Sequence, residues 1–173
     1  MANINLFYKK LLAHEGGFVD NKKDRGGPTN KGITLETAKH YNLDKDHDGD
    51  VDPADIRLID DNDFKMVLKI GYWDQCKADL IWNQSIAEII VDWNYLSGVI
   101  AIKEVQRILN VKDDGLVGKV TMDILNTANQ AELFNSIKKA RLAHIARIIK
   151  VRPDQKIFKA GWTNRVNSFK FIQ

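Results

Sequence analysis

The twelve residues SIAEIIVDWNYL, at positions 85–96, decide the class of fold that this chain can adopt. Isoleucine, valine, tryptophan and leucine recur around most of the circumference of a helix drawn through this stretch. A helix that is apolar on nearly all sides is stable only when neighbouring elements cover it. The stretch therefore predicts a helix through the centre of the core, which Gly98 then ends.

The segments on either side of this helix also have mostly helical patterns. Ile4, Phe7 and Leu11 follow the spacing of one helical face. Residues 19–34 are too rich in glycine, asparagine, aspartate and proline for a helix, and they predict a loop or a short β-ribbon. Further helices are expected at 34–41, from Asp52, from Asp60, and at 102–109, 121–125 and 131–150, and the tail with Phe158, Trp162 and Phe169 is expected to pack back on the core. The pattern predicts a mainly α fold.

The composition indicates a compact globular protein. The chain has 173 residues, 44% of them hydrophobic, and only three prolines. One cysteine, Cys76, excludes an internal disulfide. The N-terminal stretch MANINLFYKK lacks the pattern of a signal peptide, and no apolar run approaches the length of a membrane span. We therefore expect a monomer that is made in the cytoplasm without a signal peptide and does not insert stably into membranes.

The charge is divided unevenly along the chain. Residues 1–92 carry 12 basic and 17 acidic residues, a net charge of −5, whereas residues 93–173 carry 14 and 6, a net charge of +8. A basic half suits a polyanionic partner, which could be nucleic acid, teichoic acid or another cell-wall polymer. The charge alone does not choose among them.

Glu15 lies on the same helical stripe as Phe7 and Leu11, and two glycines follow it. A carboxyl group among apolar side chains at the negative end of a helix is disfavoured as an anion, so we expect its pKa to be raised. Glycoside hydrolysis needs such a general acid to protonate the leaving oxygen. The glycines would allow a sugar ring to approach the backbone closely. The alternative is that Glu15 is an ordinary exposed residue at a helix end.

The motifs EGGF at 15–18 and DRGGPTNKGIT at 24–34 resemble the signature of glycoside hydrolase family 108. This family consists of phage, prophage and bacterial N-acetylmuramidases with a lysozyme-like fold. The resemblance implies that Glu15 is the catalytic acid. By a weaker analogy with other phage lysozymes, Asp24 and Thr29 would position the attacking water or stabilise positive charge at the anomeric carbon. Asp24 and Thr29 could equally be ordinary turn residues.

The acidic stretch DKDHDGDVDPAD at 44–55 matches the calcium-loop pattern at positions 1, 3, 5, 6 and 12 and has an apolar residue at position 8. The expected ligands of a structural calcium ion are Asp44, Asp46, Asp48, Asp50 and Asp55. Aspartate at the last position reaches less far than the usual glutamate. The alternative is a solvated acidic turn in which Asp52 and Asp55 only cap a helix.

The C-terminal half carries two further motifs. The run VQRILNV at 105–111, followed by Asp114-Gly115, Gly118 and Thr121, and the stretch FKAGWTNR at 158–165 resemble the predicted peptidoglycan domain that accompanies the family. This resemblance implies a division into a lysozyme-like catalytic region at 1–94 and a helical peptidoglycan-binding region at 95–173. The same residues could instead serve only packing.

The family's central helix usually has an asparagine where this chain has Leu96. On the same helix, Asp92 is expected either to be paired in the core or to face the cleft.

Together the two family resemblances imply an endolysin-like N-acetylmuramidase. It would hydrolyse the β-1,4 bond between N-acetylmuramic acid and N-acetylglucosamine in bacterial peptidoglycan, with Glu15 as general acid and no cofactor needed for the chemistry. It would act on the wall after release or export. Two alternatives stay open: a non-catalytic, calcium-dependent wall-binding module, and nucleic-acid binding through the basic half, which we do not expect.

Overall fold

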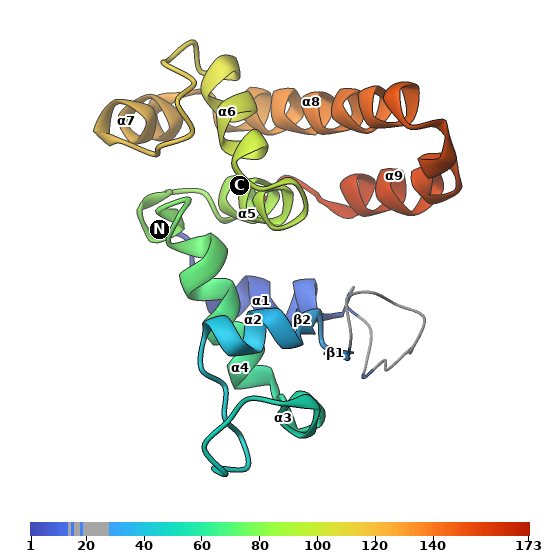
Figure 1. Cartoon of the computed structure of the whole chain (residues 1–173). Helices are drawn as coiled ribbons and strands as arrows, with labels where there is room; N and C mark the ends of the chain where they lie inside the picture. Colours follow the sequence, from blue (N-terminus) through green and yellow to red (C-terminus); the bar gives the residue numbers. More distant parts are fainter. Residues whose placement is uncertain (14, 16–17, 19–27) are drawn as a thin grey trace. The chain divides into compact units, whose positions relative to one another are not determined.

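The computed structural model describes residues 1–13, 15, 18 and 28–173, and its helices and one small hairpin confirm the mainly α prediction (Figure 1). The chain forms two compact units. One comprises Ile4–Gly71, and the other comprises Met1–Asn3 together with Tyr72–Gln173. Within the described residues, no helix is both long and apolar enough to cross a bilayer.

The unit formed by Ile4–Gly71 contains four α-helices and one hairpin among its described residues. In chain order these elements are α1 (Ile4–Leu12), β1 (Thr29–Asn30), β2 (Ile33–Thr34), α2 (Leu35–His40), α3 (Pro53–Leu58) and α4 (Asp61–Leu68). The predicted face of α1 is buried through Ile4, Phe7 and Leu11. Helix α4 packs on α1 and buries Phe64. These apolar side chains form the core of this unit.

The hairpin confirms the short β-ribbon predicted in this region. Strands β1 and β2 are antiparallel, with Thr29 opposite Thr34 and Asn30 opposite Ile33. The two turn residues, Lys31 and Gly32, have φ values of +51° and +77°. Two positive φ values are typical of the tight two-residue turn whose twist matches that of paired strands. The glycine makes this turn possible at low cost.

Two aspartates cap the starts of α3 and α4, as the sequence predicts. Asp52 caps α3, and its side chain accepts a hydrogen bond from the backbone N–H of Ala54. Asp60 caps α4 by accepting from Asn62 and Asp63. In each case the third helical residue is also an aspartate that bonds back to the cap, which satisfies a further backbone N–H.

The second unit is built around α5 (Gln84–Ser97). Ten consecutive residues, Ser85–Asn94, are buried in this helix, which confirms it as the centre of its core. The side chain of Asn83 caps its first turn. Helices α6 (Val99–Ile108) and α8 (Gln130–Val151) both pack on α5. The π-helical turn η1 (Lys69–Trp73) follows α4 and leads the chain into this unit. The remaining elements are η2 (Ala78–Leu80), α7 (Lys119–Thr127), η3 (Pro153–Phe158) and α9 (Lys159–Ser168).

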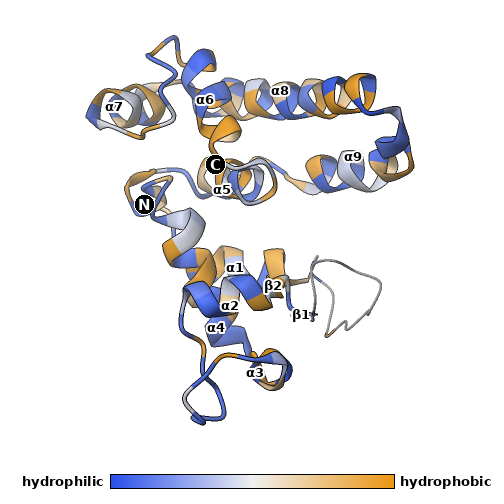
Figure 2. Ribbon diagram, in the orientation of Figure 1, coloured by the Kyte–Doolittle hydropathy of each residue, from blue (hydrophilic) through white to orange (hydrophobic). Residues whose placement is uncertain are grey.

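Helices α8 and α9 form a hairpin joined by the 3₁₀ turn η3 (Figure 1). The α8 ribbon alternates between hydrophobic and hydrophilic residues, as expected for a helix packed on one side (Figure 2). Val166 of α9 is buried, so the tail does pack back on the core. The prediction is wrong for Phe158, however, whose side chain is 48% exposed because it lies in η3 at the end of the hairpin.

Candidate active site

Glu15 lies just beyond the C-terminus of α1 and is partly buried. Its backbone N–H donates to the carbonyl of Leu12 at 3.0 Å, so the chain makes one more turn after the last α-helical residue. The helix was predicted to continue to Glu15 and instead ends at Leu12. The final turn of a helix commonly tightens in this way, because its last carbonyls have no α-helical partner.

Phe18, the aromatic residue of the EGGF motif, is anchored by a cation–π contact. The guanidinium carbon of Arg57 lies 4.4 Å from the centroid of the Phe18 ring. Arg57 belongs to α3, so this contact joins the segment after α1 to a helix that comes 39 residues later in the chain. Contacts of this kind contribute about 0.5–1 kcal/mol when exposed and more when desolvated.

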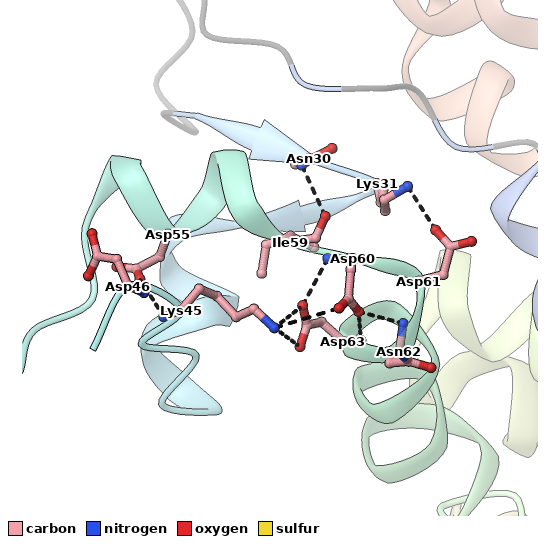
Figure 3. A network of polar contacts seen from close by, with 10 residues as sticks. All are labelled: Asn30, Lys31, Lys45, Asp46, Asp55, Ile59, Asp60, Asp61, Asn62 and Asp63. Carbon is pink, nitrogen blue, oxygen red and sulfur yellow. Dashed lines mark hydrogen bonds and ion pairs between the residues drawn. The ribbon is translucent and has the colours of Figure 1, made fainter. Parts of the chain in front are cut away.

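Asn30 fixes the hairpin to α3, and sequence reasoning did not single it out. Its side chain is buried, and Nδ2 donates to the carbonyl oxygen of Ile56 at 2.9 Å. Nδ2 also donates to the carbonyl oxygen of Ile59 at 3.4 Å (Figure 3). These carbonyls lie at the C-terminal end of α3, where a helix leaves acceptors unpaired. Thr29 precedes Asn30 on β1 and is partly buried. The amide of Asn30 therefore holds the backbone that carries Thr29.

Two lysines join this region to the start of α4 (Figure 3). Lys31 Nζ lies 2.8 Å from Asp61 Oδ1. Lys45 Nζ lies 2.9 Å from Asp63 Oδ2 and 3.8 Å from Asp60 Oδ2. The hydrogen bond to Asp63 raises the pKa of Lys45 above its ordinary value. Lys45 therefore ties the acidic loop to α4.

The acidic loop folds through its own carboxylates. Asp44 accepts the backbone N–H groups of His47 at 2.7 Å and Gly49 at 3.1 Å. Asp46 accepts from Asp48, and Asp48 accepts from Asp50. Gly49 has φ +101°, which suits the glycine at the sixth position of the loop. These hydrogen bonds and the positive φ of Gly49 together shape the turn of the acidic loop.

The carboxylates of the acidic loop, which include the five predicted metal ligands and Asp52, gather in two groups. Carboxylate oxygens of Asp44, Asp46 and Asp48 lie within 4.8 Å of one another, and those of Asp50, Asp52 and Asp55 form a second such group. Partial loss of hydration, together with repulsion by neighbouring carboxylates, raises the pKa of Asp46. The charge of Asp48 is the main cause that raises the pKa of Asp50. A divalent cation would relieve this repulsion.

Asp55 differs from the other acids of the loop because it is fully buried. It accepts backbone N–H groups from Asp52 at 2.8 Å, Lys45 at 2.5 Å and Asp46 at 3.3 Å. These hydrogen bonds hold the pKa of the Asp55 carboxyl below its usual range. Asp55 is therefore the residue that closes the loop onto α3.

Asp24 lies outside the residues that the structure describes, as do His14, Gly16 and Gly17. Its predicted role at the anomeric carbon stays a prediction.

In the C-terminal half, the motif residues Gln106, Asp114 and Gly115 are joined by hydrogen bonds. The buried side chain of Gln106 accepts from Gly115 N at 2.8 Å and donates to Asp114 Oδ1 at 3.1 Å and to the carbonyl of Leu116 at 3.0 Å. Gly115 has φ +81°, and a Cβ there would collide with Val99. The glutamine and the glycine together shape the loop that follows α6.

Asp92 is paired in the core, which decides between the two roles expected for it. Its side chain is 1% exposed, with Oδ2 2.6 Å from Nη2 of Arg141 and Oδ1 2.8 Å from Nη2 of Arg165. Burial lowers the pKa of Arg141, although the nearby Asp92 counters this effect. Arg165 is the last residue of the FKAGWTNR motif, so this part of the motif attaches α9 to α5.

Asn94, two positions before Leu96, is a further residue that the sequence did not single out. It is 1% exposed, and neither its amide nitrogen nor its amide oxygen has a hydrogen-bond partner in the described part of the chain. Most buried side-chain polar groups in proteins have a partner. Leu96, at the position where the family has asparagine, is 48% exposed.

Comparisons with known proteins matched two families in succession. Residues 8–98 match Glycosyl hydrolase 108, and residues 100–167 match the Predicted Peptidoglycan domain. Among solved structures, the chain is similar to that described as "Structure of Brucella abortus SagA". The identity is 27% and the TM-score is 0.76, over 95% of this chain and 89% of that one. No curated protein matched.

Proposed function

Because the chain belongs to glycosyl hydrolase family 108, we propose that it is an N-acetylmuramidase in which Glu15 is the general acid. The chain is a glycosyl hydrolase that carries a peptidoglycan domain, and this pair implies peptidoglycan as the substrate. The proposed bond is the β-1,4 link between N-acetylmuramic acid and N-acetylglucosamine. Membership in a hydrolase family favours this enzyme over a non-catalytic wall-binding module.

The observation that carries the proposal is the position of Glu15 within the matched region. It lies directly after α1 and is partly buried, and the cation–π contact anchors Phe18 three residues later. A general acid needs a carboxyl that is protonated at working pH, and we propose that Glu15, beyond the C-terminal end of α1, meets this need.

In the proposed reaction, the Glu15 carboxyl donates its proton to the bridging oxygen as the bond to the anomeric carbon breaks. The sugar on the other side of the bond acquires oxocarbenium character. Asp24 and Thr29 are proposed to orient the attacking water or to stabilise this positive charge. Thr29 is suited to a fixed position, because it pairs with Thr34 in the hairpin that Asn30 holds to α3.

The experiment that tests the bond is the digestion of purified peptidoglycan followed by borohydride reduction of the new ends. An N-acetylmuramidase yields fragments that end in reduced N-acetylmuramic acid, identified by mass spectrometry. Fragments that end in reduced N-acetylglucosamine would contradict the proposed bond. A Glu15→Gln variant should yield neither, whereas Glu36→Gln, a change at an exposed glutamate in the same unit, should digest the wall like the parent.

We also propose a structural calcium ion in the loop at residues 44–55. The donor set fits a hard cation, because the loop supplies carboxylates in two close groups and turns at Gly49. Asp44, Asp46, Asp48, Asp50 and Asp55 would hold the ion, and Asp55 would do so with the oxygen lone pairs that its backbone hydrogen bonds leave available.

Thermal melting in calcium and in a chelator tests this second proposal. Millimolar calcium should raise the melting temperature of the parent and have a much smaller effect on Asp44→Asn/Asp48→Asn. An equal melting temperature with and without calcium would leave the loop as a solvated acidic turn.

The enzyme is proposed to act as a phage or prophage endolysin that reaches the wall after release from the cytoplasm. Expression in the cytoplasm alone should leave cells intact, and the same chain directed to the periplasm should lyse them. Lysis without export would contradict this order of events.

A further inference from the structure

The turn between α8 and α9 combines exposed apolar residues with a cluster of cations. We call residues 150–159, KVRPDQKIFK, the hairpin tip; it contains η3 and lies at the end of the α8–α9 hairpin (Figure 1). Val151 is 80% exposed, Ile157 is 79% exposed and Phe158 is 48% exposed. Four basic residues occur in the same ten positions, with Asp154 as the single acid: Lys150, Arg152, Lys156 and Lys159.

The exposed apolar side chains of the tip do not hold the turn together. Backbone hydrogen bonds do so instead, from Arg152 to Ile148 at 2.7 Å and from Gln155 to Arg152 at 3.0 Å. The core residues of the hairpin, such as Ile145 and Val166, are buried elsewhere along α8 and α9. The apolar side chains of the tip are therefore available for contact with another surface.

Phe158 anchors the hairpin tip to α9. Its ring stacks on that of Trp162 in α9, with centroids 5.7 Å apart and an interplanar angle of 27°. The stack fixes one face of Phe158 against the helix and leaves about half of its surface to solvent. Ile157 directly precedes this anchored residue in the chain and is exposed.

Single exposed apolar residues are normal on protein surfaces. Three of them within ten residues that also hold four cations combine the two features that favour the surface of an anionic bilayer, which are exposed apolar area and positive charge. There, the apolar side chains enter the boundary between headgroups and acyl chains, while lysine and arginine extend to the lipid phosphates. An anionic wall polymer would use the cations but would gain little from Val151 or Ile157.

We propose that the hairpin tip binds peripherally to the surface of an anionic phospholipid bilayer. The apolar side chains would insert between the lipid headgroups, and the cations would be attracted to the negatively charged surface. The binding goes beyond the proposed hydrolysis and does not depend on it, because bilayer and peptidoglycan are different ligands. The tip lies on the surface and does not cross the bilayer.

Sedimentation of the full chain with lipid vesicles tests the proposal. The parent should bind vesicles that contain phosphatidylglycerol and phosphatidylcholine and should not bind phosphatidylcholine alone. Val151→Ser/Ile157→Ser should weaken binding by about tenfold or more, because two exposed apolar contacts are lost without disturbing the core. Lys156→Gln/Lys159→Gln should also weaken it, and added salt should reduce the binding of the parent.

The matched control is Leu116→Ser/Val120→Ser, which removes two apolar side chains that are 73% and 65% exposed outside the tip. This control should bind like the parent. The proposal is overturned if the parent does not bind anionic vesicles, or if the control weakens binding as much as the tip variant does. It is also overturned if the serine variant of the tip binds like the parent while the glutamine variant does not, since that result indicates recognition of charge alone. Wall hydrolysis plays no part in the readout, so failure here is distinct from failure of the muramidase proposal.

Discussion

Arg165 donates two hydrogen bonds to Oδ1 of Asp92, at 3.1 Å from Nε and 2.8 Å from Nη2, although 73 residues separate them in the sequence. Arg141 bonds to the other oxygen of the same carboxylate. One buried acid thus joins α5, α8 and α9.

Replacing Asp92 should therefore destabilise the second unit strongly. Asp92→Asn removes the buried carboxylate charge that binds both arginines, and the expected loss is about 3–5 kcal/mol in the free energy of unfolding. Urea unfolding monitored by circular dichroism measures it. Asp154→Asn, at an exposed acid, should change the free energy by no more than about 0.5 kcal/mol. Should the Asp92 variant unfold at the same urea concentration as the parent, the cluster does not support the fold.

Asn30→Ala should loosen the hairpin that carries Thr29. The change leaves the carbonyls of Ile56 and Ile59 without the Asn30 amide, and the expected cost is about 1–3 kcal/mol. Because the hairpin positions Thr29, the rate of peptidoglycan hydrolysis should also fall. Lys31→Ala removes only a surface ion pair and should cost about 0–1 kcal/mol. Equal effects from the two variants would argue against a special role for the buried amide.

Two glycines of the C-terminal half should respond to alanine in opposite directions. Gly115→Ala should destabilise by about 1–3 kcal/mol, because φ is +81° there and the new Cβ meets Val99. Gly161 lies in α9 with open space around its Cα, so Gly161→Ala should stabilise by about 0.5–1 kcal/mol. Thermal melting of both variants checks the signs. A neutral result at Gly115 would mean that the loop can shift at little cost.

Stability should also depend on pH through Asp114. Hydrogen bonds from the Leu116 N–H and then from the Gln106 amide lower the pKa of its carboxyl in the folded state. A lowered folded pKa means that the ionised carboxyl stabilises the fold above the unfolded pKa of about 3.9. This contribution is lost as pH falls through the folded pKa.

Asp114→Asn should accordingly be less stable than the parent near neutral pH, and the difference should shrink below about pH 4. Urea unfolding at several pH values, with Asp154→Asn as the control, measures it. A difference that is constant with pH would assign the effect to packing rather than to ionisation.

Much of the fold follows from local patterns in the sequence. The apolar run at 85–96 predicts α5, and the spacing of Phe7 and Leu11 predicts the buried face of α1. Asp52 and Asp60 predict the starts of α3 and α4, because a cap acts within its own turn. These features depend on residues that are close in the chain.

The features that the sequence did not predict depend on distant residues. Which polar side chain becomes buried depends on the partner that the fold brings to it, as Asn30 shows with the end of α3. The end of α1 at Leu12 and the exposure of Phe158 likewise depend on packing that periodicity does not encode. Asp92 could be assigned to the core only once Arg141 and Arg165 were seen beside it.

The role of Glu15 is tested most directly by comparing two substrates that differ in their need for an acid. Peptidoglycan has a poor leaving group that must be protonated, whereas a nitrophenyl glycoside of an N-acetylated oligosaccharide has a good one. Relative to the parent, Glu15→Gln should lose on the order of 10²–10⁴-fold in rate on peptidoglycan and far less on the nitrophenyl glycoside. Equal losses on both substrates, or hydrolysis of peptidoglycan at the parental rate, would contradict the assignment of Glu15 as the general acid.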